Sequence, residues 1–120
     1  MASEKMQMLE EAGFDTQGAL SRLMQNESFY LRLLNKFLAD VNFQKLIENI
    51  AAGDEKASGE SAHALKGVTA TLGMTELSEC CATLQNIYLG REAGDPVPVF
   101  ARAKELYEQH MELLPRVMGA

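Results

Sequence analysis

Several features of membrane, secreted and nucleic-acid-binding proteins are absent from this sequence. It has no tryptophan, and no apolar run approaches the ~20 residues that span a bilayer. Its first residues, MASEK, lack the basic-then-apolar pattern of a signal peptide. Lysine and arginine number 11 against 17 aspartates and glutamates, so the formal charge of −6 disfavours binding to phosphate polyanions. We therefore expect a cytoplasmic protein that binds neither membranes nor nucleic acid.

Cysteine is scarce, and its placement excludes two common roles. The two cysteines, Cys80 and Cys81, are adjacent. Neighbouring residues of a helix point about 100° apart, which is poor geometry for a disulfide. The pair also lacks the spacing of structural zinc ligands. We expect reduced cysteines in a cytosolic setting, no metal site, and a Cys81 that packs as a small apolar residue.

The composition that remains favours one helical domain. Hydrophobic residues make up 47% of the chain and charged residues 23%, the balance of a globular protein with one core. There are only three prolines, and abundant leucine, alanine, glutamate and methionine favour helices over strands. A chain of 120 residues has the usual length of one domain. We expect a single domain over residues 1–120, with its core at about 12–118 and no separate catalytic domain.

Capping residues and glycines divide the chain into helices. Ser, Thr, Asp and Asn side chains cap helix N-termini, and glycine commonly follows helix C-termini. The helices are predicted to begin at Asp15 or Thr16, Asn26, Asp54, Thr75 and Asp95. They are predicted to stop at Gly13, at Gly53, near Leu72 and near Gly90.

The spacing of apolar residues predicts how these helices are arranged. One apolar stripe ends at Val41 and the next, displaced in phase, starts at Phe43, so we expect a break near residues 40–42. Pro96 opens the last helix, and Pro115 is predicted to end or kink it. Four longer helices with short connections predict an all-α fold: an antiparallel up-down-up-down four-helix bundle with a short extra N-terminal helix, in a monomeric protein. The first stripe comprises Tyr30, Leu33, Leu34, Phe37 and Val41.

The helix that follows Asp54 carries a histidine opposite its apolar residues. Leu65, Val68, Thr69 and Leu72 fall within about 100° of arc, which is the predicted buried stripe. His63 lies about 180–200° from the leucines of that stripe. Its imidazole is therefore predicted to face solvent.

The neighbours of His63 on this exposed face are unusual in combination. Gly59 and Gly67 each lie four residues away, and glycine inside a helix costs about 1 kcal/mol relative to alanine. Lys66 lies one turn after His63 and places an ammonium group near the ring. Each residue alone has an ordinary structural explanation. Together they predict a clearance in which a nucleophilic His63 accepts an anionic group such as a phosphoryl group.

Hairpin geometry adds Gln85 to this site. Residues equally far from an antiparallel turn face each other, and His63 and Gln85 are equally distant in sequence from Met74. The Gln85 amide is therefore predicted to lie beside the imidazole, where it can hydrogen-bond the ring or a phosphoryl oxygen. A glutamine at the boundary of a buried stripe is also an ordinary structural feature. The other histidine, His110, lacks the lysine and the glycine, which favours a structural role.

The residues from His63 to Gly73, HALKGVTATLG, carry a family resemblance. Histidine followed by lysine and glycine at the third and fourth positions, with Leu-Gly at the turn, resembles the histidine-containing phosphotransfer (HPt) domain motif. The resemblance extends from about residue 12 to the end of the chain. It includes Gly13-Phe14-Asp15, the aromatic Phe29, Tyr30 and Phe37, and Gly53-Asp54. The chain departs from the family pattern at Ser58, Gly59 and Ser61, where larger or apolar residues are usual.

This resemblance implies a phosphocarrier in a bacterial multistep phosphorelay. His63 would accept a phosphoryl group from the aspartate of a receiver domain and pass it to another receiver, with Nε2 as the acceptor atom. The sequence alone does not distinguish Nε2 from Nδ1. The implied partners are response-regulator receiver domains and a hybrid histidine kinase, and the receiver would supply Mg²⁺. Lys66 would provide local positive charge.

The chain is not expected to be an enzyme or to bind a cofactor of its own. It has no glycine-rich nucleotide loop and no GxxxxGK[ST] sequence, so it lacks the means to phosphorylate itself from ATP. Two alternatives remain: the phosphoacceptor domain of a chemotaxis-type histidine kinase, and a helical interaction module that is never phosphorylated. A mostly apolar docking patch is expected around His63, with Ala70, Ala82 and Tyr88 as neighbours.

Overall fold

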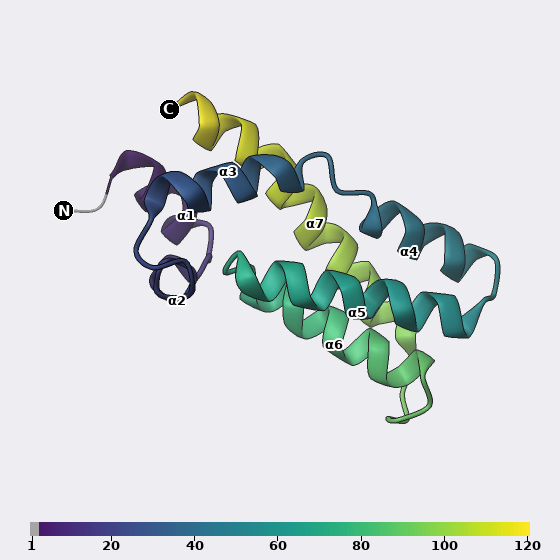
Figure 1. Ribbon diagram of the computed structural model, residues 1–120. Coiled ribbons are helices and arrows are strands. Elements are labelled where there is room, and N and C mark those ends of the chain that lie inside the picture. The colour runs from purple at the N-terminus through teal and green to yellow at the C-terminus, as the bar shows by residue number, and fades with distance from the viewer. Residues whose placement is uncertain (1–2) are drawn as a thin grey trace.

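The computed structural model describes residues 3–120, and within this range the chain forms helices and no strands (Figure 1). This confirms the prediction of an all-α fold. Across the same residues, no helix combines the length and the apolar character of a membrane span. The helices are α1 (Glu4–Glu11), α2 (Thr16–Arg22), α3 (Glu27–Phe37), α4 (Asn42–Ala51), α5 (Glu55–Thr71), α6 (Thr75–Tyr88) and α7 (Pro96–Gly119).

The bundle has four arms. The first is formed by α3 followed by α4, and the other three are α5, α6 and α7. Figure 1 shows α3 and α4 following each other along one side of the molecule, with α5 and α6 forming a hairpin beside them. α5 packs against both α4 and α6, and α6 packs against α7. The long α7 also reaches α3 and α1. The predicted up-down-up-down bundle is confirmed, with α1 and α2 preceding it.

The break in the first arm lies where the change of phase predicted it. α3 ends at Phe37 and α4 begins at Asn42. The Asp40 carboxylate accepts a hydrogen bond from the Asn42 backbone N–H at 2.8 Å, which stabilises the turn. The prediction that Val41 belongs to the buried stripe is wrong, since this side chain is 57% exposed. Val41 lies in the turn, where helical periodicity no longer decides which way a side chain points.

Most of the predicted caps are confirmed. The side chains of Asp15, Asn26, Asp54 and Asp95 each accept a hydrogen bond from a backbone N–H in the first turn of α2, α3, α5 and α7. The prediction that Thr75 caps α6 is wrong. Met74 holds the N-cap position without a side-chain hydrogen bond, because its buried side chain packs in the core and Thr75 is already helical.

Pro115 does not end α7, which continues to Gly119. A proline inside a helix removes the backbone hydrogen bond to the carbonyl four residues earlier. The residues after Pro115 keep their own N–H donors, so the following turn still forms. Lys5 supports this end of the helix by donating from Nζ to the carbonyl oxygens of Val117 and Met118 at 3.0 and 3.1 Å.

Aromatic stacking joins α4 to α7 in the core. The rings of Phe43 and Tyr107 are stacked with centroids 4.1 Å apart, and Phe100 lies beyond Phe43 at 6.0 Å. Both cysteines are free, as predicted, and Cys81 is fully buried. Burial raises the pKa of the Cys81 thiol to about 12, so this group packs as an apolar residue.

The N-terminal segment completes the C-terminal end of α5. The last carbonyls of a helix lack partners within the helix. Here the buried hydroxyl of Tyr30 donates to the Leu72 carbonyl oxygen at 2.7 Å. The Asp15 backbone N–H donates to the Gly73 carbonyl oxygen at 2.8 Å. Gly73 has a φ of +78°, and a Cβ there would lie 2.6 Å from the Asp15 carbonyl oxygen, so only glycine fits this turn.

Candidate functional site

His63 lies on the exposed side of α5, as predicted. Leu65, Thr69 and Leu72 are buried on the opposite side. The Thr69 hydroxyl is accommodated there because it donates to the Leu65 carbonyl oxygen at 2.6 Å. The apolar stripe therefore fixes the rotation of α5 about its axis, and this rotation presents the imidazole to solvent.

Gln85 lies beside the imidazole, so the hairpin prediction of its place is confirmed. The amide nitrogen of Gln85, on α6, is 3.0 Å from Nδ1 of His63. The Gln85 side chain is only 4% exposed, so its position is set by packing. Its Oε1 atom is buried with no hydrogen-bond partner. The described residues provide no partner for the other ring nitrogen, Nε2 of His63, which is left available to an incoming group.

Lys66 lies one turn after His63 and is half-buried. Its ammonium group forms no ion pair with an acidic side chain in residues 3–120, so its charge is not neutralised within the molecule. The backbone at this point is held in place, since the Lys66 carbonyl oxygen accepts from the Ser78 hydroxyl of α6 at 3.1 Å. The Lys66 backbone is therefore tied to α6, one turn after the exposed His63.

The two glycines of α5 have different roles. A Cβ at Gly67 would meet nothing within 4 Å, so this exposed position is open, as the predicted clearance requires. The prediction that Gly59 contributes to the same clearance is wrong. Gly59 is buried, and a Cβ there would lie 2.5 Å from Cδ2 of Leu89. It is a packing glycine that lets the end of α6 approach the beginning of α5.

The other small residues near the start of α5 also serve packing. Ser58 is fully buried and donates to the Asp54 carbonyl oxygen at 2.7 Å. Ser61 is 8% exposed, and its hydroxyl oxygen accepts from the Asn49 amide of α4 at 2.9 Å. Small side chains in this turn let α5 lie close to α4 while their hydroxyl groups remain hydrogen-bonded.

A groove of about 450 Å³ opens between α3 and α5, next to Gly67. Its lining is mainly apolar, with Lys36 and Asp40 as the charged residues. The sequence does not reveal this groove, because helical periodicity assigns the same residues of α3 to a buried stripe and does not say how closely α3 approaches α5. Its lining residues are Leu33, Lys36, Phe37, Asp40, Gly67, Val68, Thr71 and Leu72.

Three residues were predicted to surround His63 in a docking patch. Ala70 is exposed on the same helix, whereas Ala82 and Tyr88 on α6 are half-buried. A mainly apolar groove also lies on the α3 side of α5, next to Gly67.

His110 has a structural place in the core, outside this site. It is buried on α7, and its ring meets that of Phe14 edge to face with centroids 4.6 Å apart. Burial lowers the pKa of His110 to about 4, partly opposed by the negative charge of Glu76, so the ring is neutral near pH 7. Within residues 3–120, no cluster of three or more His, Cys, Asp or Glu side chains is placed to hold a metal ion.

Residues 32–114 of the chain match the family model of the Hpt domain. The match includes His63, Lys66, Gly67 and Gln85, and it begins within α3. No curated protein and no solved structure matches the chain significantly. The N-terminal residues that complete the end of α5, Asp15 and Tyr30, lie outside the matched range.

Proposed function

The chain belongs to the Hpt domain family, whose members are phosphotransfer intermediates of phosphorelays and interact with receiver domains, and on this premise we propose that His63 is the phosphoacceptor. It accepts a phosphoryl group from the phosphorylated aspartate of a receiver domain and passes it to an aspartate of another receiver. The observation that carries the proposal is the imidazole itself, which is exposed, held through Nδ1 by Gln85, and open at Nε2.

Nε2 of His63 is the proposed nucleophile. Its lone pair attacks the phosphorus atom of the acyl phosphate. The N–P bond forms as the P–O bond to the aspartate breaks, and the aspartate leaves as a carboxylate with the electron pair of that bond. The reverse sequence, with a second aspartate as the attacking group, returns the ring to its starting state.

This step requires the neutral ring to carry its proton on Nδ1, because Nε2 must offer a lone pair. When the Gln85 amide nitrogen donates to Nδ1, the ring proton is on Nε2 and Oε1 of Gln85 is buried without a partner. A half-rotation of the amide brings Oε1 to the position where it accepts from Nδ1–H. We propose this second arrangement for the reactive state, since it frees the Nε2 lone pair.

Lys66 and Gly67 have complementary proposed roles. The unpaired ammonium of Lys66 stabilises negative charge on the phosphoryl oxygens as the group arrives at His63. Gly67 leaves the helix backbone uncovered, so the receiver can approach closely enough for in-line transfer.

The groove between α3 and α5 supports docking of a receiver at this face. Transient interfaces have apolar centres and polar rims, and the groove has that character beside the open Gly67 position. In this proposal the receiver supplies the Mg²⁺ and most of the charge stabilisation, so the chain needs no cofactor of its own. We further propose that it is a monomeric, cytoplasmic carrier. A hybrid histidine kinase is a further proposed partner, through its receiver domain.

The experiment is transfer of label from a phosphorylated receiver domain to the chain. Phosphohistidine is labile in acid and stable in base, so label of that kind is expected on the unaltered protein and not on His63→Gln. His110 is retained in this variant and serves as an internal control for a second histidine. Acid-labile label that persists in His63→Gln contradicts the proposal. Label that appears only with ATP and a chemotaxis-type kinase domain, without a receiver, identifies a kinase phosphoacceptor domain instead.

A further inference from the structure

Arg22 lies at the end of the α5 face that carries His63. It is the last residue of α2, which packs against α5 and precedes the residues matched to the family. Its Nη2 atom donates to the carbonyl oxygens of Ala70 and Thr71 at 2.6 and 3.4 Å. Ala70 is exposed two turns after His63 on the same side of α5. The guanidinium therefore borders the surface that a partner covers when it reaches the imidazole.

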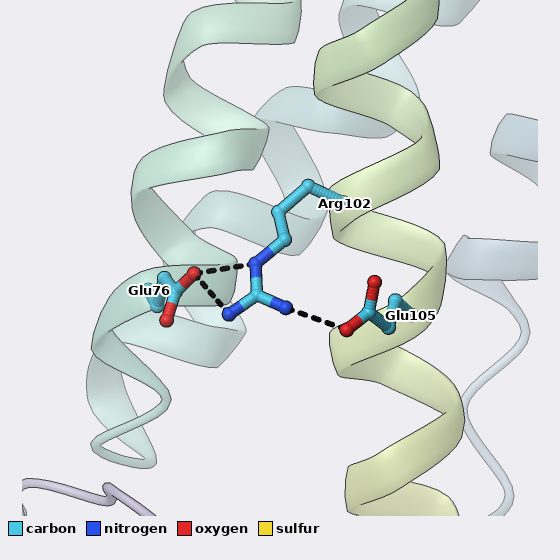
Figure 2. A network of polar contacts seen from close by, with 3 residues as sticks. All are labelled: Glu76, Arg102 and Glu105. Atoms are coloured by element: carbon cyan, nitrogen blue, oxygen red, sulfur yellow. Dashed lines mark hydrogen bonds and ion pairs between the residues drawn. The ribbon is translucent and has the colours of Figure 1, made fainter.

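Much of the hydrogen-bonding capacity of Arg22 is unused. A guanidinium has five N–H donors, and in residues 3–120 only Nη2 of Arg22 has a partner. Arg102 is the opposite case: Figure 2 shows its guanidinium between Glu76 and Glu105, with ion-pair distances of 2.6 and 2.8 Å. Arg22 is exposed and has no such ion pair in the described part of the chain. Its charge and most of its donors face solvent.

The surface beside Arg22 has room for a single carboxylate to pair with the guanidinium. A recess of about 260 Å³ adjoins it, with Asp15, Arg22, Ala70, Thr75, Ser78 and Glu79 as lining residues. The Asp15 carboxylate is occupied by the N-terminus of α2, where it accepts from the Gly18 backbone N–H at 2.9 Å. Glu79 is exposed and would repel a second carboxylate placed near it. Arg22 is therefore the one lining residue of this recess whose charge attracts a carboxylate.

We propose that Arg22 selects partners: its guanidinium pairs with a carboxylate of the receiver domain that docks over His63. This inference rests on the proposed function, because it assumes that a receiver covers this face. A receiver with an acidic residue at the matching point gains a charge-assisted hydrogen bond. One with a basic residue there meets a repulsive charge, so Arg22 discriminates between partners. The selecting residue thus comes from the N-terminal segment, outside the matched family range.

The test uses the full chain and one phosphorylated receiver domain. This receiver is chosen from a panel as the one that transfers its phosphoryl group to the chain fastest. Arg22→Glu is expected to slow transfer roughly tenfold at low ionic strength, with a smaller effect in 0.5 M salt because exposed charges are screened. Lys104→Glu, an equal change of charge on the exposed side of α7, is the matched control and is expected to have little effect. Replacing the contacting receiver carboxylate with lysine is expected to restore transfer to Arg22→Glu.

Two measurements separate this role from the alternatives. Labelling of His63 by phosphoramidate needs no receiver, so it reports on the acceptor alone and is expected to be unchanged in Arg22→Glu. If Arg22→Glu does not fold, Arg22→Gln keeps N–H donors for the α5 carbonyls and is expected to reduce transfer by a smaller, salt-dependent factor. Equal slowing by Arg22→Glu and Lys104→Glu, or slowing that salt does not change, overturns the proposal. Failure of phosphoramidate labelling in the unaltered chain would instead count against His63 as the acceptor.

Discussion

The amide nitrogen of Gln85 lies 3.0 Å from Nδ1 of His63, so a buried residue of α6 holds the exposed ring of α5 by one of its two nitrogens. This contact determines which nitrogen faces solvent. It also couples the tautomer of the ring to the orientation of one amide, whose oxygen is otherwise without a partner.

Replacing Gln85 with leucine is expected to separate reactivity from stability. Leucine has a similar volume and removes a buried oxygen that lacks a hydrogen bond, so the free energy of unfolding should stay the same or rise. Phosphoramidate labelling of His63 should slow roughly tenfold, because the ring is no longer held with its proton on Nδ1. Unfolding in urea and the rate of labelling check the two effects. Unchanged labelling would show that Gln85 is only a packing residue.

Gly67→Ala and Gly59→Ala make a matched pair on one helix. Alanine at Gly67 meets no other atom, so it should stabilise the protein by about 0.5–1 kcal/mol through helix propensity. At Gly59 the same change places a Cβ 2.5 Å from Leu89 and should destabilise the fold by about 1–3 kcal/mol. Gly67→Ala should nevertheless slow transfer from a receiver, because the added methyl group projects from the docking face. A more stable variant with normal transfer would argue against the clearance.

Lys66→Gln is expected to slow transfer while leaving the fold intact. The ammonium group of Lys66 has no ion-pair partner within the described residues, so its removal should change the free energy of unfolding by no more than about 0.5 kcal/mol. Loss of a charge that stabilises the transferring phosphoryl group should reduce the transfer rate roughly ten- to a hundredfold. Lys56→Gln, at an exposed position earlier in α5, is the control. Equal slowing by both variants would indicate a general effect of net charge.

His110 should make the stability of the protein depend on pH. Its pKa is lowered from 6.5 to about 4 in the folded state, so below pH 6.5 the unfolded chain binds the proton more readily. The stability that the neutral ring contributes is present in full above pH 6.5 and is lost as the pH falls toward 4. The loss is on the order of 3 kcal/mol.

Urea unfolding between pH 4 and 8 measures this effect, and His110→Leu is the comparison. The carboxylates titrate in both proteins, so the difference in slope between them reports on His110. The variant should lose less stability than the unaltered protein between pH 6.5 and pH 4. If the free energy of unfolding changes equally with pH in the unaltered protein and in His110→Leu, His110 is not the cause of the pH dependence.

Much of the fold follows from local sequence, and particular residues show why. Asp15, Asn26, Asp54 and Asp95 cap helices because a cap depends on a hydrogen bond that spans only a few residues. The same pattern predicts a cap at Thr75, and this prediction is wrong because Met74, buried in the core, holds the N-cap position of α6. The prediction that Val41 is buried is wrong for a related reason, because helical periodicity applies only while the chain remains helical.

The sequence by itself determined that His63 faces solvent, with Lys66 and Gly67 beside it, because helical periodicity and one apolar stripe fix which side of α5 is buried. It also determined that Gln85 lies next to the ring, because a tight antiparallel hairpin fixes which residues face each other. Only the tertiary structure decided that Gly59 packs against Leu89, that a groove opens between α3 and α5, and that Arg22 reaches the end of α5. These features depend on the distance and angle between segments far apart in the chain, which side-chain volumes across the whole core set together.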